Sequence, residues 1–242
     1  MCIAGVSAAR TLEASNQSTA RLQRKMLMQK HPPQMNFDLQ NRRLYGILDM
    51  GYVAPSETIR VATEMLEGGV EILQLRAKGV QPAQILKLAV PLVPICKRFG
   101  VPFIINDHPE VVVESGADGL HVGQDDILVK VARDLIGPDK IVGLSTHSLL
   151  QAESALREKP DYIGFGPLFS TPTKPDYMSI GTSRISEVHR LVPLPIYCIG
   201  GIKLENLPEV LSAGAQRVAI VSGILKAEKI ADYCRTCRAA LE

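Results

Sequence analysis

Short apolar runs alternate with longer amphipathic segments along the chain after residue 43. Runs rich in β-branched and aromatic residues are typical of buried strands, and apolar positions three and four apart are typical of helices. The pattern predicts strands at Leu44–Leu48, Val70–Leu75, Phe103–Ile105, Gly119–Val122, Ile141–Leu144, Tyr162–Phe165, Ile196–Ile199 and Arg217–Val221. The helices predicted between and after them include Glu57–Leu66, Gln84–Phe99, Ile127–Ile136, Leu149–Arg157, Leu204–Ser212 and Leu225–Leu241.

This order of elements predicts the fold. Strands that alternate with helices pair in parallel through right-handed crossovers. Eight such units in about 200 residues fit the compact end of the (β/α)8 TIM barrels, a single α/β domain. Such a barrel carries its active site at the carboxyl ends of its strands, so the polar residues that follow each strand are the candidates for function.

The first 43 residues do not share the pattern. They are rich in Ser, Gln, Arg and Met, and they include the helix-breaking sequence His31-Pro32-Pro33. Since they contain no apolar segment of the secretory type, they do not resemble a signal peptide. We expect residues 1–43 to form a basic, disordered N-terminal extension and residues 44–242 to form the catalytic barrel. A misassigned start codon and an organelle transit peptide are the alternatives.

Composition and charge narrow the classes of function. The 242 residues are 46% hydrophobic and 21% charged, as in folded globular proteins. The net charge of +2 divides into +5 for residues 1–43 and −3 for residues 44–242, so the barrel has no general attraction for nucleic acid. The sequence contains no apolar run of the roughly 20 residues that a membrane helix needs. We therefore expect no nucleic-acid partner and no membrane association.

Cysteine usage suggests a reducing, cytoplasmic setting. The five cysteines are too few and too scattered for a disulfide framework. Cys234 and Cys237 form one C-x-x-C pair on the last predicted helix, but a zinc site would need two further ligands at metal spacing.

Cationic and amide side chains follow the second strand. In Gln74-Leu75-Arg76-Ala77-Lys78, alternation places Gln74, Arg76 and Lys78 on one side of the strand and the two apolar residues on the other. An amide, a guanidinium and an ammonium at the mouth of a barrel suit a polyanion. A solvated loop is the alternative interpretation.

Carboxylates follow the third and fourth strands. The third ends in Asn106-Asp107, and the fourth continues into His121-Val122-Gly123-Gln124-Asp125-Asp126. Carboxylates on neighbouring strands can share Mg²⁺, whose shell is completed by phosphate oxygens and water. Asp126 also fits the N-cap of the next helix, and His121 fits either a substrate contact or a hydrogen-bonded interior histidine.

The fifth and sixth strands are followed by hydroxyl-rich segments. Ser145-Thr146-His147 fits either catalysis or the cap of the next helix. The connection from Gly166 to Gly181 is long enough for an active-site lid. Within it, Thr171, Thr173 and Lys174 offer hydroxyls and a cation to a phosphate.

Small residues follow the last two strands. Gly200-Gly201 and Ser222-Gly223 let the backbone N–H groups approach a phosphate, which barrels frequently bind at this place. The mouth thus offers a neutral cup for a monophosphate and, beside it, a set of cations and carboxylates for a Mg²⁺-bound diphosphate. The sequence shows no Ser-His-Asp or Cys-His nucleophile, so displacement of pyrophosphate by positioning and electrostatics is the expected chemistry.

These motifs, in this order and spacing, resemble the thiamine phosphate synthase family. The resemblance rests on Gln74–Lys78, Ile105–Asp107, Gly119–Asp126, Gly166–Lys174 and Ile199–Ile202, and it extends from Leu44 to about Leu241. It implies a barrel that joins 4-amino-2-methyl-5-hydroxymethylpyrimidine diphosphate to 4-methyl-5-(2-hydroxyethyl)thiazole phosphate, with release of pyrophosphate.

The resemblance also implies roles for individual residues. The pyrimidine diphosphate would be held by Gln74, Arg76, Lys78, Asn106 and Lys174. Mg²⁺ would be ligated by Asp107 and Asp126, and Ser145 would assist the departing pyrophosphate. The thiazole phosphate would be held by Thr171, Thr173, Gly201, Val221 and Ser222. Pyrophosphate would leave first, giving a cation that the thiazole nitrogen captures.

Two other functions stay open at this point. A thiazole tautomerase has the same fold and thiazole phosphate cup, but it needs no diphosphate site. A barrel that binds a thiamine precursor without turnover is the second alternative. This chain also departs from the family at Ala77, where many members have Glu, and at His108-Pro109 after the Asn-Asp pair. The substrates are small molecules, and the sequence is compatible with a homo-oligomer.

Overall fold

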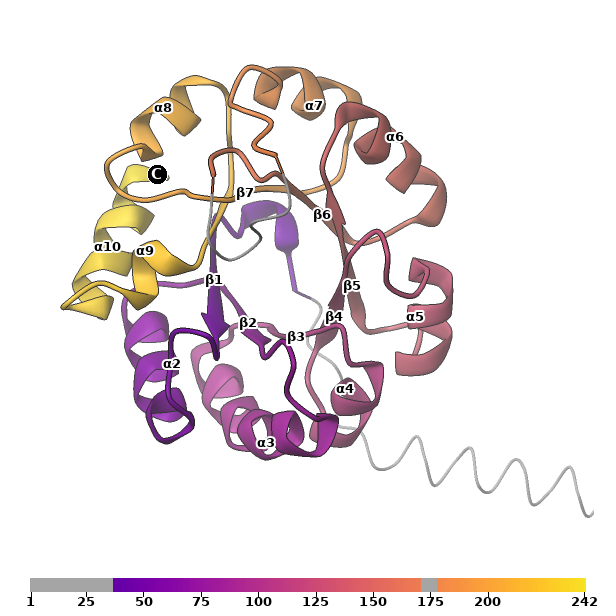
Figure 1. Ribbon diagram of the computed structural model, residues 1–242, viewed down its shortest axis with the longest axis vertical. Coiled ribbons are helices and arrows are strands. Elements are labelled where there is room, and N and C mark those ends of the chain that lie inside the picture. The colour runs from indigo at the N-terminus through magenta and orange to yellow at the C-terminus, as the bar shows by residue number, and fades with distance from the viewer. Residues whose placement is uncertain (1–36, 171–177) are drawn as a thin grey trace, which may run out of the picture. The chain divides into compact units, whose positions relative to one another are not determined.

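The computed structural model describes residues 37–170 and 178–242. Within them, eight parallel strands close a barrel in which each strand pairs with the next and β8 returns to β1 (Figure 1). This confirms the (β/α)8 barrel. The strands are β1 (Leu44–Asp49), β2 (Ile72–Arg76), β3 (Phe103–Asn106), β4 (Gly119–Val122), β5 (Ile141–Thr146), β6 (Tyr162–Phe165), β7 (Ile196–Ile199) and β8 (Val218–Ile220).

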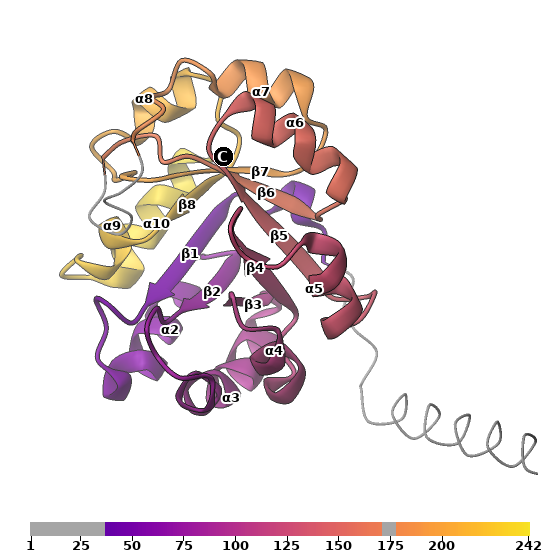
Figure 2. The same ribbon diagram turned by 45° about the vertical axis from the view of Figure 1, so that its right-hand side comes forward.

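Helices form the outer layer of the barrel, and the two views agree on this arrangement (Figures 1 and 2). They are α2 (Thr58–Glu67), α3 (Pro82–Phe99), α4 (Pro109–Ser115), α5 (Val129–Ile136), α6 (Leu149–Glu158), α7 (Ile185–Leu191), α8 (Leu207–Ser212), α9 (Ser222–Leu225) and α10 (Ile230–Ala240). Two short 3₁₀ turns, η1 (Leu39–Asn41) and η2 (Pro55–Glu57), precede β1 and α2. Each amphipathic segment that was predicted to be helical overlaps an α-helix of the structure.

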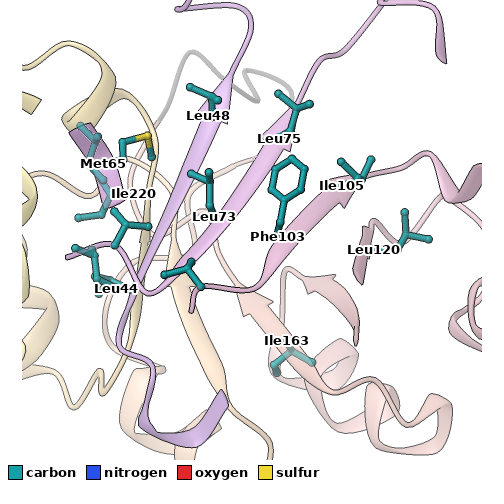
Figure 3. Close-up of a cluster of buried hydrophobic side chains, with 14 of the residues drawn as sticks. Leu44, Leu48, Met65, Leu73, Leu75, Phe103, Ile105, Leu120, Ile163 and Ile220 are labelled. Carbon is teal, nitrogen blue, oxygen red and sulfur yellow. The ribbon is translucent and has the colours of Figure 1, made fainter. Parts of the chain in front are cut away.

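The strands separate two layers of buried side chains. Leu73 and Leu75 of β2 point toward the helices, where they join the large apolar cluster between strands and helices (Figure 3). Ile72 belongs to the second, smaller cluster, inside the barrel, where Tyr45, Tyr162 and Tyr197 also lie. Because side chains alternate along a strand, Gln74 also faces the interior.

The compact unit begins at Phe37, ahead of the Leu44 boundary expected from the sequence. The turn η1 is hydrogen-bonded to the barrel: the Tyr197 hydroxyl donates to the carbonyls of Leu39 and Arg42, at 3.1 and 3.0 Å. The Arg217 guanidinium donates to the carbonyl of Gln40, at 2.6 Å from Nη2. The segment is held by polar contacts and has no apolar periodicity, so the hydrophobic pattern of the sequence does not reveal it.

In the described ranges, the helices are all too short or too polar to cross a bilayer.

Candidate active site

A cavity opens at the carboxyl ends of the strands. It has a volume of about 890 Å³, measured out to its open mouth. Seven of the thirteen residues to which the family resemblance assigns a role line it: Gln74, Arg76, Asn106, Ser145, Gly201, Val221 and Ser222. These residues come from five strands and the loops that follow them, so the closure of the barrel brings them together.

The segment after β2 has the alternation that its sequence predicts. Gln74 is 2% exposed and faces the interior, whereas Leu75 and Ala77 are buried on the side of the helices. Arg76 lines the cavity. Lys78, Asp107 and Asp126 are not among the residues that line it, and the Lys78 ammonium forms an ion pair with Asp107. Ala77 therefore points away from the cavity, so its difference from the Glu of many family members does not alter the cavity lining.

A carboxylate that sequence reasoning missed holds Arg76. Asp49, at the end of β1, is 3% exposed, and its Oδ2 is 2.5 Å from Nη1 of Arg76. Its Oδ1 accepts a hydrogen bond of 2.8 Å from the backbone N–H of Gly51. The carboxylate is thus fixed from two sides and orients the guanidinium. The signal in the sequence is an acid that directly ends an apolar strand.

Asp107 and Asp126 form a pair of neighbouring carboxylates. Asp107 has a left-handed backbone conformation (φ 64°), which is uncommon for residues other than glycine, although Asp adopts it more often than most. Burial raises the pKa of Asp107, the Lys78 ammonium opposes this rise, and the carboxylate of Asp126 adds to it. Two carboxylates that interact in this way are suited to sharing a cation.

The structure decides two alternatives that the sequence left open. Helix α5 begins at Val129 after Leu128, so Asp126 is not its N-cap; its carboxylate accepts a 2.7 Å hydrogen bond from the N–H of Gly123. Helix α6 is capped by Ser148, whose hydroxyl accepts from the N–H of Gln151. The interpretation of the 145–147 segment as a helix cap is therefore wrong.

A chain of hydrogen bonds crosses the barrel along the wall of the cavity, through residues that all line it. Gln74 Nε2 donates to the Tyr45 hydroxyl at 2.9 Å, and this hydroxyl lies 2.8 Å from that of Tyr162. His121 Nδ1 is 3.0 Å from the Tyr162 hydroxyl, and its Nε2 is 2.9 Å from Oγ of Ser145. His121 is thus an interior histidine with both ring nitrogens hydrogen-bonded. Sequence reasoning missed the tyrosines, which are indistinguishable there from aromatic core residues.

The loop after β7 packs closely on the loop after β6. Gly200 and Gly201 both have positive φ angles, of 100° and 68°. A Cβ atom on Gly201 would come within 2.7 Å of the Cβ of Phe169, and one on Gly200 would overlap Pro167. The glycines therefore allow this close approach as well as leaving the backbone open to the cavity.

The predicted lid residues Thr171, Thr173 and Lys174 lie outside the described residues. In the described part of the chain, no three His, Cys, Asp or Glu residues gather closely enough to hold a metal ion by themselves. A cation between Asp107 and Asp126 would take its remaining ligands from water and from a bound anion, as Mg²⁺ commonly does.

Comparisons with known proteins agree with one another. The family model described as thiamine monophosphate synthase matches residues 44–224. The thiamine-phosphate synthase of Shouchella clausii is 39% identical over 201 residues, which cover 83% of this chain and 96% of that protein. The thiamine-phosphate synthase of Halalkalibacterium halodurans is also 39% identical, with 83% and 95% covered. A solved structure of thiamine phosphate pyrophosphorylase from Pyrococcus furiosus superposes with a TM-score of 0.76 at 28% identity, covering 84% of this chain and 96% of that one.

Proposed function

Because the chain belongs to the thiamine monophosphate synthase family, we propose that it transfers the pyrimidinylmethyl group of 4-amino-2-methyl-5-hydroxymethylpyrimidine diphosphate to 4-methyl-5-(2-hydroxyethyl)thiazole phosphate. The products are thiamine monophosphate and pyrophosphate. The proposal is supported by a cavity whose lining includes Arg76, together with the ion pair of Lys78 with Asp107 and the interaction of Asp107 with Asp126.

The diphosphate binds at the β2 and β3 edge of the cavity. Arg76 and Lys78 supply positive charge there, and the Asn106 amide lines the same wall. Gln74 lies deeper in the barrel, where it contributes to the pyrimidine end of the substrate site. Lys174, from the connection after β6, completes the positive charge around the diphosphate. Fixed cations of this kind stabilise the charge that develops on a departing pyrophosphate.

The residues fit a magnesium ion. Asp107 and Asp126 offer carboxylate oxygens from the segments that follow β3 and β4, and the Asp126 carboxylate contributes to the raised pKa of Asp107. That repulsion is relieved by a divalent cation, and the hard carboxylate oxygens match Mg²⁺. When bound, the ion supplies Lewis-acid neutralisation of the diphosphate charge. Lys78, which forms an ion pair with Asp107, would add positive charge beside the diphosphate.

The thiazole phosphate binds at the loops after β7 and β8. Gly201, Val221 and Ser222 line this side of the cavity, and their backbone N–H groups suit a monophosphate. The hydroxyls of Thr171 and Thr173 add further donors from the connection after β6. The two substrates thus approach from opposite sides of one pocket.

The reaction proceeds by dissociation. The bond between the pyrimidine methylene carbon and the diphosphate oxygen breaks, and the oxygen keeps the electron pair. Ser145 donates a hydrogen bond to the leaving oxygen, while Arg76, Lys78 and Lys174 balance its charge. The thiazole nitrogen then supplies its electron pair to the methylene carbon and forms the new C–N bond. Holding both substrates in one pocket supplies the positioning that this step needs.

The cellular setting we propose is the reducing cytoplasm. Cys96, Cys198, Cys234 and Cys237 are all free and buried. Burial raises the pKa of each of these thiols to about 12, so they remain protonated and unreactive in the fold.

A two-substrate assay tests the proposal. The full-length protein, given both phosphorylated substrates and Mg²⁺, is expected to release pyrophosphate and form thiamine monophosphate, and to do neither with one substrate alone. Isomerisation of a thiazole carboxylate phosphate without pyrophosphate release would instead indicate a tautomerase. Binding of the thiazole phosphate with neither activity would indicate a non-catalytic binding protein.

A further inference from the structure

The hydrogen-bond chain along the cavity wall connects two residues of the proposed site. Gln74, from β2, lies at one end, and Ser145, from β5, lies at the other. Tyr45, Tyr162 and His121 connect them from β1, β6 and β4. Of the ring groups in between, both tyrosines are at most 2% exposed. Burial raises the pKa of Tyr45 and Tyr162 far above the ordinary value, so each keeps its single hydroxyl hydrogen.

The first donor sets the direction of the chain. The Gln74 amide nitrogen can only donate, so the Tyr45 oxygen accepts its hydrogen. Among the described residues, the Tyr45 hydroxyl contacts only Gln74 and Tyr162. Its own hydrogen must therefore go to Tyr162, because in the opposite order it would be buried without an acceptor. A buried hydroxyl hydrogen without an acceptor is unfavourable.

The same reasoning continues to Ser145. Since Tyr162 accepts from Tyr45, its own hydrogen is directed to Nδ1 of His121, 3.0 Å away. An imidazole that accepts at Nδ1 carries its hydrogen on Nε2. This Nε2–H then donates to Oγ of Ser145 at 2.9 Å.

We propose that Tyr45, Tyr162 and His121 are positioning residues that act as a fixed relay of hydrogen-bond donors, holding Ser145 with its own hydroxyl hydrogen directed into the cavity. This inference rests on the proposed function, in which the Ser145 hydroxyl donates a hydrogen bond to the leaving oxygen of the diphosphate. Ser145 is then a donor before substrate arrives, and no proton is transferred along the chain. The Gln124 amide steadies the same residue by donating to its carbonyl at 2.6 Å.

The aromatic cluster offers a matched control. Tyr197 packs edge-to-face on both Tyr45 and Tyr162, with ring centroids 5.2 and 5.4 Å away. Its hydroxyl, however, points to the amino end of the barrel, where it donates to the carbonyls of Leu39 and Arg42. Tyr197→Phe therefore removes a buried hydroxyl from the same cluster without interrupting the relay, whereas Tyr162→Phe interrupts it next to His121.

The experiment reads the histidine tautomer directly. Full-length protein labelled with ¹⁵N-histidine is examined by NMR at neutral pH without substrate, and the His121 signals are assigned by their loss in His121→Gln. We expect neutral His121 with its hydrogen on Nε2 in the wild type and in Tyr197→Phe. In Tyr162→Phe we expect a mixture of tautomers, together with a fall in kcat of at least tenfold and changes in KM below about threefold.

Three results would overturn the relay. They are a wild-type His121 with its hydrogen on Nδ1, a doubly protonated His121, and a Tyr162→Phe variant that keeps the wild-type kcat. If Tyr162→Phe does not fold, Tyr45→Phe makes the same test from the other end, because it removes the donor to Tyr162. The tautomer is measured without turnover, so a wild type that has the expected tautomer but forms no thiamine monophosphate contradicts the proposed function and leaves the hydrogen-bond order standing.

Discussion

The carboxylate of Asp49 fixes the guanidinium of Arg76 across two adjacent strands. The two residues are register partners at the carboxyl ends of β1 and β2, and their side chains are only 4% and 14% exposed. Burial removes the solvent screening that makes surface ion pairs weak. Loss of one partner leaves the other charge buried and poorly paired, which costs about 3–5 kcal/mol in typical cases. Asp49 therefore stabilises both the barrel and the orientation of Arg76.

We expect Asp49→Asn to raise the KM for the pyrimidine diphosphate about tenfold, because the guanidinium loses its fixed orientation. Arg76→Ala, which removes the charge itself, is expected to abolish turnover while the barrel stays folded. Steady-state kinetics and circular dichroism measure the two effects. Asp232→Asn is the control: its ion pair with Arg235 is more than half exposed, so neither KM nor stability is expected to change. An unchanged KM in Asp49→Asn would contradict the role of Asp49, and near-normal rates in Arg76→Ala would contradict the diphosphate site.

A second prediction concerns the metal. If Asp126 is a Mg²⁺ ligand, Asp126→Asn raises the Mg²⁺ concentration for half-maximal activity by at least about tenfold, and Asp126→Ala abolishes turnover. Chelation of Mg²⁺ is expected to stop the wild-type reaction, and added Mg²⁺ to restore it. Asp125→Asn, in the same loop but outside the proposed ligand pair, should keep the wild-type Mg²⁺ dependence. A Mg²⁺ titration that is identical in Asp126→Asn and the wild type would remove Asp126 from the site.

The order of strands and helices could be predicted from the sequence because each element has its own apolar period. β4, β6 and β7 have the predicted bounds, and the other strands differ only near their ends. The two-residue alternation of β2 also predicted that Gln74 and Arg76 share one face of the strand and Leu75 the other, because this alternation is a local property of a strand.

The missed residues depend on contacts between strands that are distant in sequence. Tyr45 follows Leu44 in an apolar run and is indistinguishable there from a core residue; only closure of the barrel brings it to Tyr162 and Gln74. Asp49 acquires its role only through pairing of β1 with β2. Hydrogen bonds and ion pairs of this kind leave no periodic signal in a single sequence.

A third prediction concerns stability at acidic pH. His189, in α7, has a buried Nε2 atom with no hydrogen-bond partner in the described structure. Burial, with a contribution from Arg217, lowers the pKa of His189 to about 4. In the unfolded chain the group titrates near 6.5, so between these values the unfolded state binds more protons and unfolding is favoured. The stability held above about pH 6.5 is therefore lost as the pH falls toward 4, by up to about 3 kcal/mol.

Urea denaturation between pH 7.5 and 4.5 measures this loss. His189→Leu is expected to reduce the acid-induced fall in the free energy of unfolding, because no buried imidazole then has to stay neutral. His108→Gln, which removes a histidine whose side chain is 28% exposed, should retain the wild-type acid sensitivity. If His189→Leu and the wild type lost the same free energy over this range, another group would be responsible.

The last prediction concerns the space that Gly143 leaves for Tyr162. These two residues are register partners on β5 and β6, and a Cβ atom on Gly143 would overlap the Tyr162 ring next to its hydroxyl. Both positions are buried in a closed barrel, so the ring cannot move without displacing its neighbours. We expect Gly143→Ala to lower the free energy of unfolding by about 2–3 kcal/mol, the upper range for overpacking, as measured by urea denaturation. Gly164→Ala is the control, since its Cβ would find its nearest neighbour at 3.7 Å, an ordinary contact with Cε1 of His121. Equal stability of the two variants would mean that the Tyr162 ring has more freedom than its packing in the barrel indicates.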